Sequence, residues 1–227
     1  MIPERTVERL SIYRRLLSAL LAEGTQSVFS HELAAMAGST PAQVRRDIMS
    51  IGYTGTPSRG YDVSGLIARI GEFLDAPEGQ GVALAGVGHL GQAIMAYFAG
   101  RRPHLAIVAA FDKDPQKVDR VIHGCPCYPV ERMEDIVREQ RIRVGIIAVP
   151  APAAQAVANT LVRAGVRGLL NFAPTRLHVP VDTYVQDADI AVFLEKVAFF
   201  ARHGTRVPAT LGEPVGSPSD ENNEDRD

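Results

Sequence analysis

The chain has 227 residues, of which 46% are hydrophobic, and its formal net charge is −2 at pH 7. This length suits one large domain or two small ones, and the apolar content is sufficient for a buried core. The charge balance excludes a strongly basic protein, so net charge alone indicates no nucleic-acid partner. The distribution is uneven: residues 204–227 hold six acidic residues and two arginines, a net charge of −4, which leaves about +2 on residues 1–203.

The two cysteines, Cys125 and Cys127, are separated by one residue. A disulfide between them would be strained, and two cysteines are too few for a disulfide scaffold, which favours a reducing cytoplasm. The N-terminus carries charged residues where a signal peptide has its apolar segment. No apolar run reaches about 18 residues. We therefore expect a cytoplasmic protein that has no signal peptide and does not span a membrane.

Three helices are predicted at the start of the chain. Apolar residues recur at the helical period from Pro3 to Glu23. A second helix is predicted to begin at Ser30 as its N-cap and to end at Gly38, and a third covers Thr40 to about Ile51. Three helices with a short glycine-containing turn before the last one form a helix-turn-helix pattern.

Local chemistry specifies the start of the third helix. Thr40 and Gln43 match a T-x-x-Q capping box, and Pro41 takes the first helical position. Apolar residues at i, i+4 and i+7 predict the core-facing side, namely Val44, Ile48 and Ile51. The solvent-facing side is then Gln43, Arg45, Arg46, Met49 and Ser50.

A pair of arginines on a helix is ordinarily a solvated surface, but Arg45 and Arg46 lie in the first two turns of the last helix. That part of a helix-turn-helix enters the major groove, where arginine forms two hydrogen bonds with guanine. The next segment, residues 52–61, is glycine-rich, carries Arg59 and suits a two-stranded wing that reaches phosphate or the minor groove. We therefore expect Gln43, Arg45, Arg46 and Arg59 to contact double-stranded DNA.

A fourth helix over 63–74 and a linker complete the first domain, predicted as a winged helix over residues 1–76. Strands and helices then alternate over residues 80–188. Strands are predicted at 81–88, 104–112, 125–130, 143–150, 166–172 and 183–188, and helices at 90–98, 133–141 and 151–165. This β-α-β order predicts an α/β fold with a Rossmann-type, doubly wound parallel sheet. A strongly apolar last helix follows at 189–203, and the acidic residues 204–227 are predicted to be disordered.

The segment Gly86-Val87-Gly88-His89-Leu90-Gly91 follows a predicted strand and opens a predicted helix. In a dinucleotide-binding G-x-G-x-x-G motif the first glycine allows the tight turn, the second lets a pyrophosphate approach, and the third lets the helix pack closely. The pyrophosphate would lie at the helix N-terminus, where His89 could also donate to it. A purely structural α/β turn is the alternative.

Asp112 ends the second predicted strand, 21 residues beyond Gly91. A carboxylate there accepts hydrogen bonds from an adenosine ribose and repels the 2′-phosphate of NADP, which favours NAD. Lys113 and Lys117 lie nearby and leave that choice open.

No metal site or catalytic site is predicted. His123, Cys125 and Cys127 are three ligands within five residues without a visible fourth, which is a poor zinc pattern. The chain has no G-x-S-x-G or Tyr-x-x-x-Lys pattern, which argues for binding NAD rather than turning it over. An NAD-dependent oxidoreductase, and a CoA- or nucleotide-binding regulator on the same fold, are the alternatives.

Taken together, a winged helix, a NAD-type domain and an apolar terminal helix resemble the Rex family of redox-sensing transcriptional repressors. The resemblance covers roughly Ile2 to His203 and is carried by the runs "IPERTVERLSIYRRLL", "TPAQVRRD", "GVGHLGQAI", "AAFDKDPQKV", "AVPAPAAQAVAN", "GLLNFAP" and "DADIAVFL".

The resemblance implies a homodimer that binds operator DNA when NADH is low and is released by NADH. The terminal helix would be exchanged between subunits. It also implies that Val149, Pro150, Asn171 and Phe172 lie near the nicotinamide end of NADH or NAD. Arg15, Tyr97 and Asp189 match the family's switch triad, in which Asp189 of one subunit pairs with Arg15 or Tyr97 of the other according to redox state; Tyr97 is also expected near the cofactor.

Three places differ from the family's usual pattern. Ser50-Ile51-Gly52 stands where Tyr-Phe-Gly is common, and Ile190 follows Asp189 where an aromatic residue is common. In the wing, residues 54–61 read TGTPSRGY where Tyr-Gly-x-Arg-Gly-x-Gly-Tyr is common, so the wing arginine is displaced. We also expect an apolar nicotinamide pocket without a nearby carboxylate, because burying the unpaired positive charge of NAD⁺ is costly and such a pocket would discriminate against it.

Overall fold

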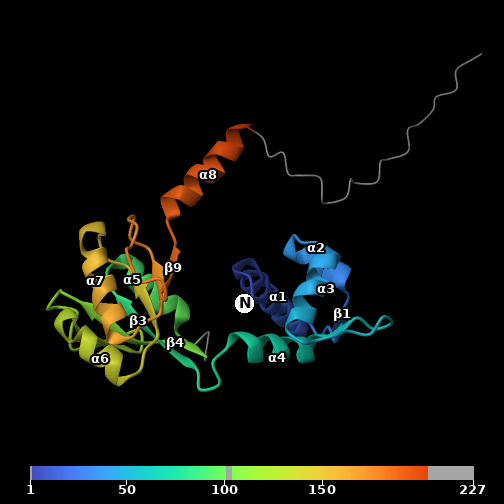
Figure 1. The fold of residues 1–227 in the computed structure, drawn as a ribbon, viewed down its shortest axis with the longest axis horizontal. Coiled ribbons are helices and arrows are strands. Elements are labelled where there is room, and N and C mark those ends of the chain that lie inside the picture. Colours follow the sequence, from blue (N-terminus) through green and yellow to red (C-terminus); the bar gives the residue numbers. More distant parts are fainter. Residues whose placement is uncertain (1, 101–103, 204–227) are drawn as a thin grey trace, which may run out of the picture. The chain divides into compact units, whose positions relative to one another are not determined.

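The computed structural model describes residues 2–100 and 104–203 (Figure 1), so the prediction for residues 204–227 lies outside the described residues. The chain divides into an N-terminal unit, which ends at Leu74, and a C-terminal unit, which begins at Asp75. Within the described ranges, no helix is long and apolar enough to cross a membrane.

The N-terminal unit packs four helices around one core. Its elements are α1 (Glu4–Ala22), β1 (Ser27–Val28), α2 (Ser30–Ala37), α3 (Pro41–Ser50), β2 (Tyr61–Asp62) and α4 (Val63–Leu74). The predicted inner side of α3 is confirmed, since Val44, Ile48 and Ile51 are at most 2% exposed. They contact Leu10 and Leu17 of α1 within the same apolar cluster, so the helix-turn-helix is held by its hydrophobic periodicity.

The helix starts differ in detail from the sequence-based prediction. Thr40 is the N-cap of α3 and accepts a hydrogen bond from the Gln43 backbone N–H at 3.2 Å. The Gln43 side chain turns to other partners, so only half of the capping box forms. The predicted N-cap Ser30 is wrong, because Phe29 caps α2 and the Glu32 carboxylate accepts its backbone N–H at 2.6 Å.

The predicted wing is reduced. Residues 52–61 hold a single bridge between Thr56 and Gly60, while β2 pairs antiparallel with β1. Strand β1 was not predicted from the sequence. Gly60 has a φ of +72°, and a Cβ there would collide with the Val28 carbonyl oxygen, so glycine is required where the two strands meet.

The C-terminal unit is an α/β domain with a seven-stranded sheet. Its strands are β3 (Gln80–Ala85), β4 (Leu105–Asp112), β5 (Arg120–Ile122), β6 (Cys125–Pro129), β7 (Val144–Ile147), β8 (Gly168–Asn171) and β9 (Tyr184–Asp187), in the order β5-β6-β4-β3-β7-β8-β9. From β6 to β9 all neighbours are parallel. This strand order is that of the Rossmann fold, which confirms the predicted doubly wound sheet.

Helices cover both faces of this sheet (Figure 1). They are α5 (His89–Phe98), α6 (Met133–Glu139) with the preceding 3-10 turn η1 (Val130–Arg132), and α7 (Ala151–Ala164); the last helix, α8 (Ile190–His203), does not pack on the sheet. Along β3, Ala83 and Ala85 belong to the core under α6 and α7, whereas Val82 and Leu84 belong to the core under α5. Alternation with period two thus gives the strand two buried faces.

Strand β5 is the one antiparallel strand of the sheet and was missed by the sequence-based prediction. It forms a hairpin with β6 in which Ile122 pairs with Cys125. The two turn residues, His123 and Gly124, have φ values of 48° and 80°. Positive φ at both central residues is typical of a type I′ turn, which suits the twist of a hairpin.

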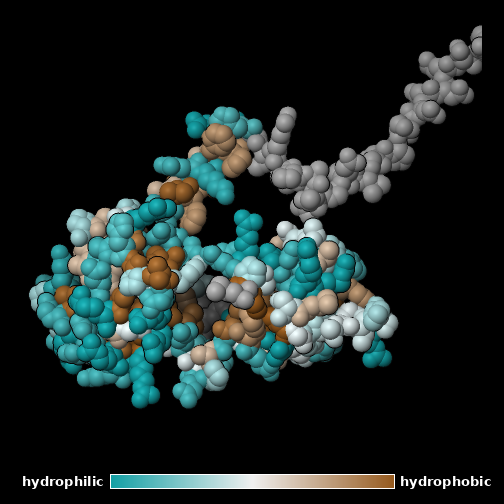
Figure 2. All heavy atoms as spheres, viewed as in Figure 1, coloured by the Kyte–Doolittle hydropathy of each residue, from teal (hydrophilic) through white to brown (hydrophobic). Residues whose placement is uncertain are grey.

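Helix α8 has no buried residue along Ile190–His203. Its apolar side chains are open to solvent in this single chain (Figure 2), and Leu194 and Val197 are 67% and 64% exposed. Aromatic residues Phe193, Phe199 and Phe200 are also exposed on it. A helix with so many uncovered large side chains presents a surface that would be buried by a partner.

Candidate functional site

The carboxyl ends of five parallel strands meet at one edge of the sheet. Ala85 of β3 is in register with Phe111 of β4 and with Ile147 of β7. Ile147 pairs with Asn171 of β8, which pairs with Asp187 of β9. The edge therefore gathers the predicted cofactor residues that follow these positions, namely the turn 86–91, Asp112, Val149, Pro150 and Phe172. The chain reverses its direction of winding between β3 and β7, which is where open α/β sheets bind ligands.

The glycine turn fits the cradle of a dinucleotide. Gly86 has a φ of +95°, and a Cβ there would collide with the Ala148 carbonyl oxygen. A Cβ on Gly91 would collide with the Gly86 carbonyl oxygen, whereas one on Gly88 would meet nothing within 4 Å. Two glycines are therefore required by packing and Gly88 faces open space, at the exposed N-terminus of α5, where anions bind. His89 and Leu90 are exposed beside it, and the Val87 side chain is buried in the core.

Asp112 is tied to this turn. Its Oδ2 accepts a hydrogen bond from the Val87 backbone N–H at 2.7 Å, and its Oδ1 accepts one from the Asp114 N–H at 2.9 Å. Lys117 Nζ lies 3.6 Å from Oδ2, and Lys113 is exposed. The carboxylate thus fixes the glycine turn, and each oxygen keeps a further lone pair that can accept a ribose hydroxyl.

The Asn171 side chain is buried and forms four hydrogen bonds within the chain. Its Nδ2 donates to the carbonyl oxygens of Ala173 and Thr175 and to Asp187 Oδ1, and its Oδ1 accepts the Ala173 N–H. Asn171 was expected near the nicotinamide. These bonds occupy its amide, so its part at this edge is to hold the following loop and Asp187 in place.

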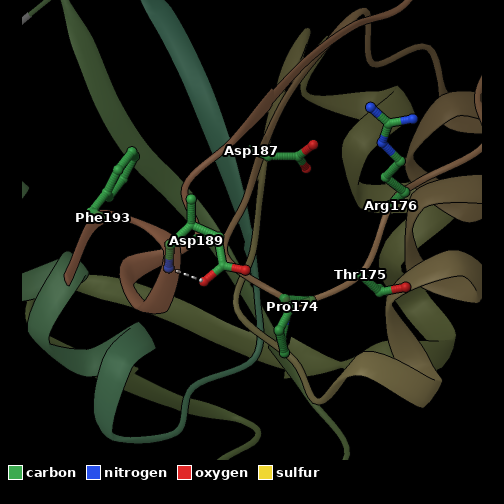
Figure 3. A pocket seen from close by; sticks show the side chains of 8 residues that line it. Pro174, Thr175, Arg176, Asp187, Asp189 and Phe193 are labelled. Carbon is green, nitrogen blue, oxygen red and sulfur yellow. Dashed lines mark hydrogen bonds between the residues drawn. The ribbon is translucent and has the colours of Figure 1, made fainter. Parts of the chain in front are cut away.

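A cavity of about 350 Å³ lies between this loop and the start of α8 (Figure 3). Its lining is Ala173, Pro174, Thr175, Arg176, Asp187, Asp189, Val192 and Phe193. Figure 3 shows the carboxylates of Asp187 and Asp189 on the same space. This cavity is not an apolar pocket without a nearby carboxylate, because strand β9 and the cap of α8 bring two carboxylates to it; the nature of the nicotinamide pocket stays a prediction.

The three predicted switch residues lie in two separate units of the chain. Asp189 caps α8, since its Oδ1 accepts the Ala191 and Val192 N–H groups at 2.9 and 3.3 Å. Arg15 lies on the exposed side of α1, in the other unit. Tyr97 is 56% exposed, and α5 carries it eight residues past His89, about 12 Å from the glycine turn. Its expected place near the cofactor stays a prediction.

The outer side of α3 presents the predicted DNA contacts. Arg45 and Arg46 are exposed, and Arg45 Nη1 donates to Ser30 Oγ of α2 at 3.0 Å. Arg46 Nη2 donates to Gln43 Oε1 at 2.9 Å. Arg59 is exposed in the loop before β2. Three cations thus lie on one unit without a carboxylate bound to any of them in the salt bridges of the described chain.

Sequence reasoning missed the acidic residue of this helix. Asp47 is 2% exposed and holds the Arg9 guanidinium through Nε–Oδ2 and Nη2–Oδ1 contacts of 2.6 and 2.8 Å. Tyr13 donates to the same carboxylate at 3.1 Å. Burial raises the pKa of Asp47, but the hydrogen bonds from Arg9, Gln43 and Tyr13 together lower it by more than burial raises it. The pKa of Asp47 therefore lies below its usual value. Burial also raises the pKa of Tyr13, to about 12.

The "HGCPC" segment is explained by the fold. Cys125 and Cys127 are free and buried in strand β6, and His123 lies in the hairpin turn. Burial, with a smaller effect from Cys127, raises the pKa of Cys125 to about 11. Over residues 2–100 and 104–203, no group of three potential ligands could hold a metal ion.

Comparison with known families matches each unit separately. Residues 1–48 match the family described as "Putative DNA-binding protein N-terminus", and residues 78–175 match the family described as "CoA binding domain". The first match contains α3 as far as Ile48, and the second contains the glycine turn and Asp112.

Similarity to whole proteins extends across both units. The redox-sensing transcriptional repressor Rex of Carboxydothermus hydrogenoformans is 41% identical over 201 residues, which cover 88% of this chain and 97% of that protein. Three solved structures of RSP, a Rex-family repressor, each cover 89% of this chain. The complex with β-NAD⁺ and operator DNA has a TM-score of 0.81 at 29% identity over 94% of that chain, and the complex with β-NADH has 0.78 at 28% over 95%. The chain belongs to the Rex family of redox-sensing transcriptional repressors.

Proposed function

We propose that this protein is a repressor whose dimer binds operator DNA when the NADH/NAD⁺ ratio is low and is released from the DNA by NADH. One observation carries this proposal. A single chain joins a glycine turn with room for a pyrophosphate to a unit whose recognition helix exposes two arginines, Arg45 and Arg46. The fold similarity to a Rex-family repressor in complex with NAD⁺ and operator DNA supports it. Because a repressor acts where the DNA is, we propose a cytoplasmic location.

The cofactor would lie across the carboxyl edge of the sheet. Gly86, Gly88 and Gly91 would form the cradle of the pyrophosphate, and Asp112 would accept the adenosine ribose. Val87, His89 and Leu90 in the turn, with Lys113 beside Asp112, complete this half of the site. Val149, Pro150 and Phe172, with the loop held by Asn171, would surround the nicotinamide half.

Bound NADH and NAD⁺ would differ at the ring by one positive charge. If the ring occupies the cavity beside Asp187 and Asp189, two carboxylates reduce the cost of the cationic form. Discrimination then arises from the conformation of the dimer that each form stabilises, since a ligand shifts an equilibrium only by its differential affinity for the two states. A coupling of about 1–3 kcal/mol changes DNA affinity about 5- to 150-fold.

The dimer would be formed through α8. Its uncovered apolar side chains support exchange of this helix with a second copy. In that arrangement Asp189 of one subunit would meet Arg15 or Tyr97 of the other. The Oδ1 atom of Asp189 accepts the capping hydrogen bonds of α8, which leaves Oδ2 to accept a hydrogen bond from the other subunit. Rotation of the subunits would then change the spacing of the two recognition helices, which must match half-sites about 34–36 Å apart.

We propose that the protein is not an enzyme, and the activity of its relatives as repressors supports this. The family match described as "CoA binding domain" supports CoA as the second candidate ligand for the same turn. Calorimetric titration with NADH, NAD⁺, NADPH and CoA separates the two. We expect NADH to bind most tightly, and the proposal fails if CoA alone binds.

The direct test is selection of a duplex from a random DNA library with and without NADH. We expect a palindromic site that is bound without NADH and released when NADH is added. Arg45→Ala should weaken binding about 5- to 150-fold, the discrimination that one bidentate base contact provides. NADH binding should be unchanged. Arg138→Ala, which removes an exposed arginine of α6, is the matched control and should bind as the parent does. Selection of no duplex, or NADH oxidation with a substrate, would refute the proposal.

A further inference from the structure

We propose that Arg9 and Asp47 are positioning residues for operator recognition, which act through Gln43 on Arg46. The proposal rests on the proposed function, because it assigns a role in reading DNA to side chains that do not reach the surface of α3. Gln43, which sequence analysis expected to contact DNA, becomes the link between them.

The network starts in the core of the N-terminal unit. Asp47 faces inward beside Val44 and Ile48, with 3% of its side chain exposed. Arg9 of α1 binds both of its carboxylate oxygens, and Tyr13 of α1 donates to one of them. A carboxylate in a core is tolerated only when it has a cationic partner and hydrogen bonds, and here α1 supplies the cation through Arg9 and a further hydrogen bond through Tyr13. These contacts therefore fix the rotation of α3 about its helix axis relative to α1.

The network continues from Asp47 to the surface along α3. Gln43 Nε2 donates to Asp47 Oδ1 at 2.8 Å, and Gln43 Oε1 accepts from Arg46 Nη2 at 2.9 Å. The three residues lie at i, i+3 and i+4 on the helix, where side chains meet. Each end of the Gln43 amide is therefore bonded to a neighbour on the same helix, and the Arg46 guanidinium is held in one orientation.

The consequence is preorganisation of one of the two paired arginines. A long side chain that is ordered only on binding loses rotamer freedom, and this loss reduces affinity. Holding Arg46 before the encounter reduces that loss. Arg45 provides an internal comparison, because its partner is Ser30 of α2 and not the Asp47 network.

Double-mutant cycles on operator affinity test the proposal. Gln43→Ala leaves the Arg9–Asp47 pair intact and is expected to weaken operator binding about 2- to 12-fold, the cost of immobilising one side chain. In an Arg46→Ala background the same change should have no effect, whereas in an Arg45→Ala background its effect should persist. Asp47→Asn should weaken binding by a similar factor and should not add to Gln43→Ala.

Controls separate positioning from stability. All variants are measured well below their unfolding midpoints, and NADH affinity serves as a check on the C-terminal unit. Glu72→Gln breaks the exposed Arg69–Glu72 pair in the same unit and should leave operator binding unchanged. Arg9→Lys should retain more affinity than Arg9→Met, because a lysine can still pair with Asp47.

The possible results decide between distinct readings. Equal effects of Gln43→Ala in the presence and absence of Arg46 would mean that Gln43 contacts DNA directly, and would overturn the positioning role. Unchanged affinity in both Gln43→Ala and Asp47→Asn would overturn it as well. A parent protein that binds no duplex would refute the proposed function and this proposal together, which distinguishes that failure from the others.

Discussion

Replacing Gly91 by alanine tests the packing of the cofactor turn. A Cβ at this position would collide with the Gly86 carbonyl oxygen and would lie 3.6 Å from Leu84 Cδ2. Gly86 has little room to retreat toward β7, because even a Cβ built on it would collide with the Ala148 carbonyl oxygen and lie 2.9 Å from Val149 Cγ1. Relief of the collision must therefore move the N-terminus of α5 away from strand β3.

The magnitude follows from the nature of the colliding atom. Overpacking a well-packed site costs about 1–3 kcal/mol, and the upper end applies when the obstacle is backbone rather than a flexible side chain. About 3 kcal/mol should lower the unfolding midpoint of the C-terminal unit by roughly 10 °C. Movement of the helix N-terminus also displaces the N–H groups that would bind the pyrophosphate, so NADH affinity should fall by about tenfold or more.

The assay combines thermal unfolding with calorimetric titration of NADH on three variants. Gly88→Ala adds a Cβ with nothing within 4 Å, so it should unfold as the parent does but bind NADH weakly, because the methyl group would occupy the space of the pyrophosphate. Gly168→Ala, in open space on β8, should change neither property. The reasoning is refuted if Gly91→Ala melts and binds NADH like the parent.

Three further predictions follow from the other sites. Asp189→Ala should let NADH bind but prevent it from releasing operator DNA, and the exposed Asp182→Ala serves as its control in a release titration. The pKa of Cys125 is raised by burial to about 11, so iodoacetamide at pH 8 should label this thiol far more slowly in the native protein than in urea. The pKa of Asp47 lies below its ordinary value of 3.8, because its hydrogen bonds outweigh burial. Its contribution to stability is therefore present above that pH and lost as the pH falls through the folded-state pKa, so the urea unfolding free energy of Asp47→Asn should fall less steeply in acid than that of the parent.

Each of these has a contrary result. Undiminished release of DNA from Asp189→Ala by NADH would remove Asp189 from the switch. Rapid labelling of the native thiol would mean that strand β6 opens readily, and parallel acid profiles for parent and Asp47→Asn would mean that the Arg9–Asp47 pair does not form in solution.

Local patterns were sufficient to predict most helices and strands of this protein. The cap at Thr40, the apolar side of α3 and the glycine turn were predicted correctly, because each depends on residues within a few positions of one another. The β-α alternation predicted a parallel, doubly wound sheet by general rules of chain winding. Two strands were missed, for different reasons. Strand β1 pairs with β2 more than thirty residues later, and strand β5 is a three-residue edge strand whose turn was not recognised as a hairpin.

The sites divide in the same way. The sequence was enough to predict the tight glycine turn and the exposed arginines of α3, because both follow from local patterns; their contacts with NADH and DNA stay predictions. The sequence also contained a sign of the buried carboxylate, because Asp47 is three residues after Val44 and so lies on the apolar side of α3. Its partner Arg9 is 38 residues away, and no local rule links the two. The pairing of Arg9 with Asp47, and the meeting of the loop 173–176 with Asp187 and Asp189 at one cavity, were decided by the packing of segments that are distant in the chain, because the free energy that holds a buried charge such as Asp47 comes from the groups that the fold brings beside it.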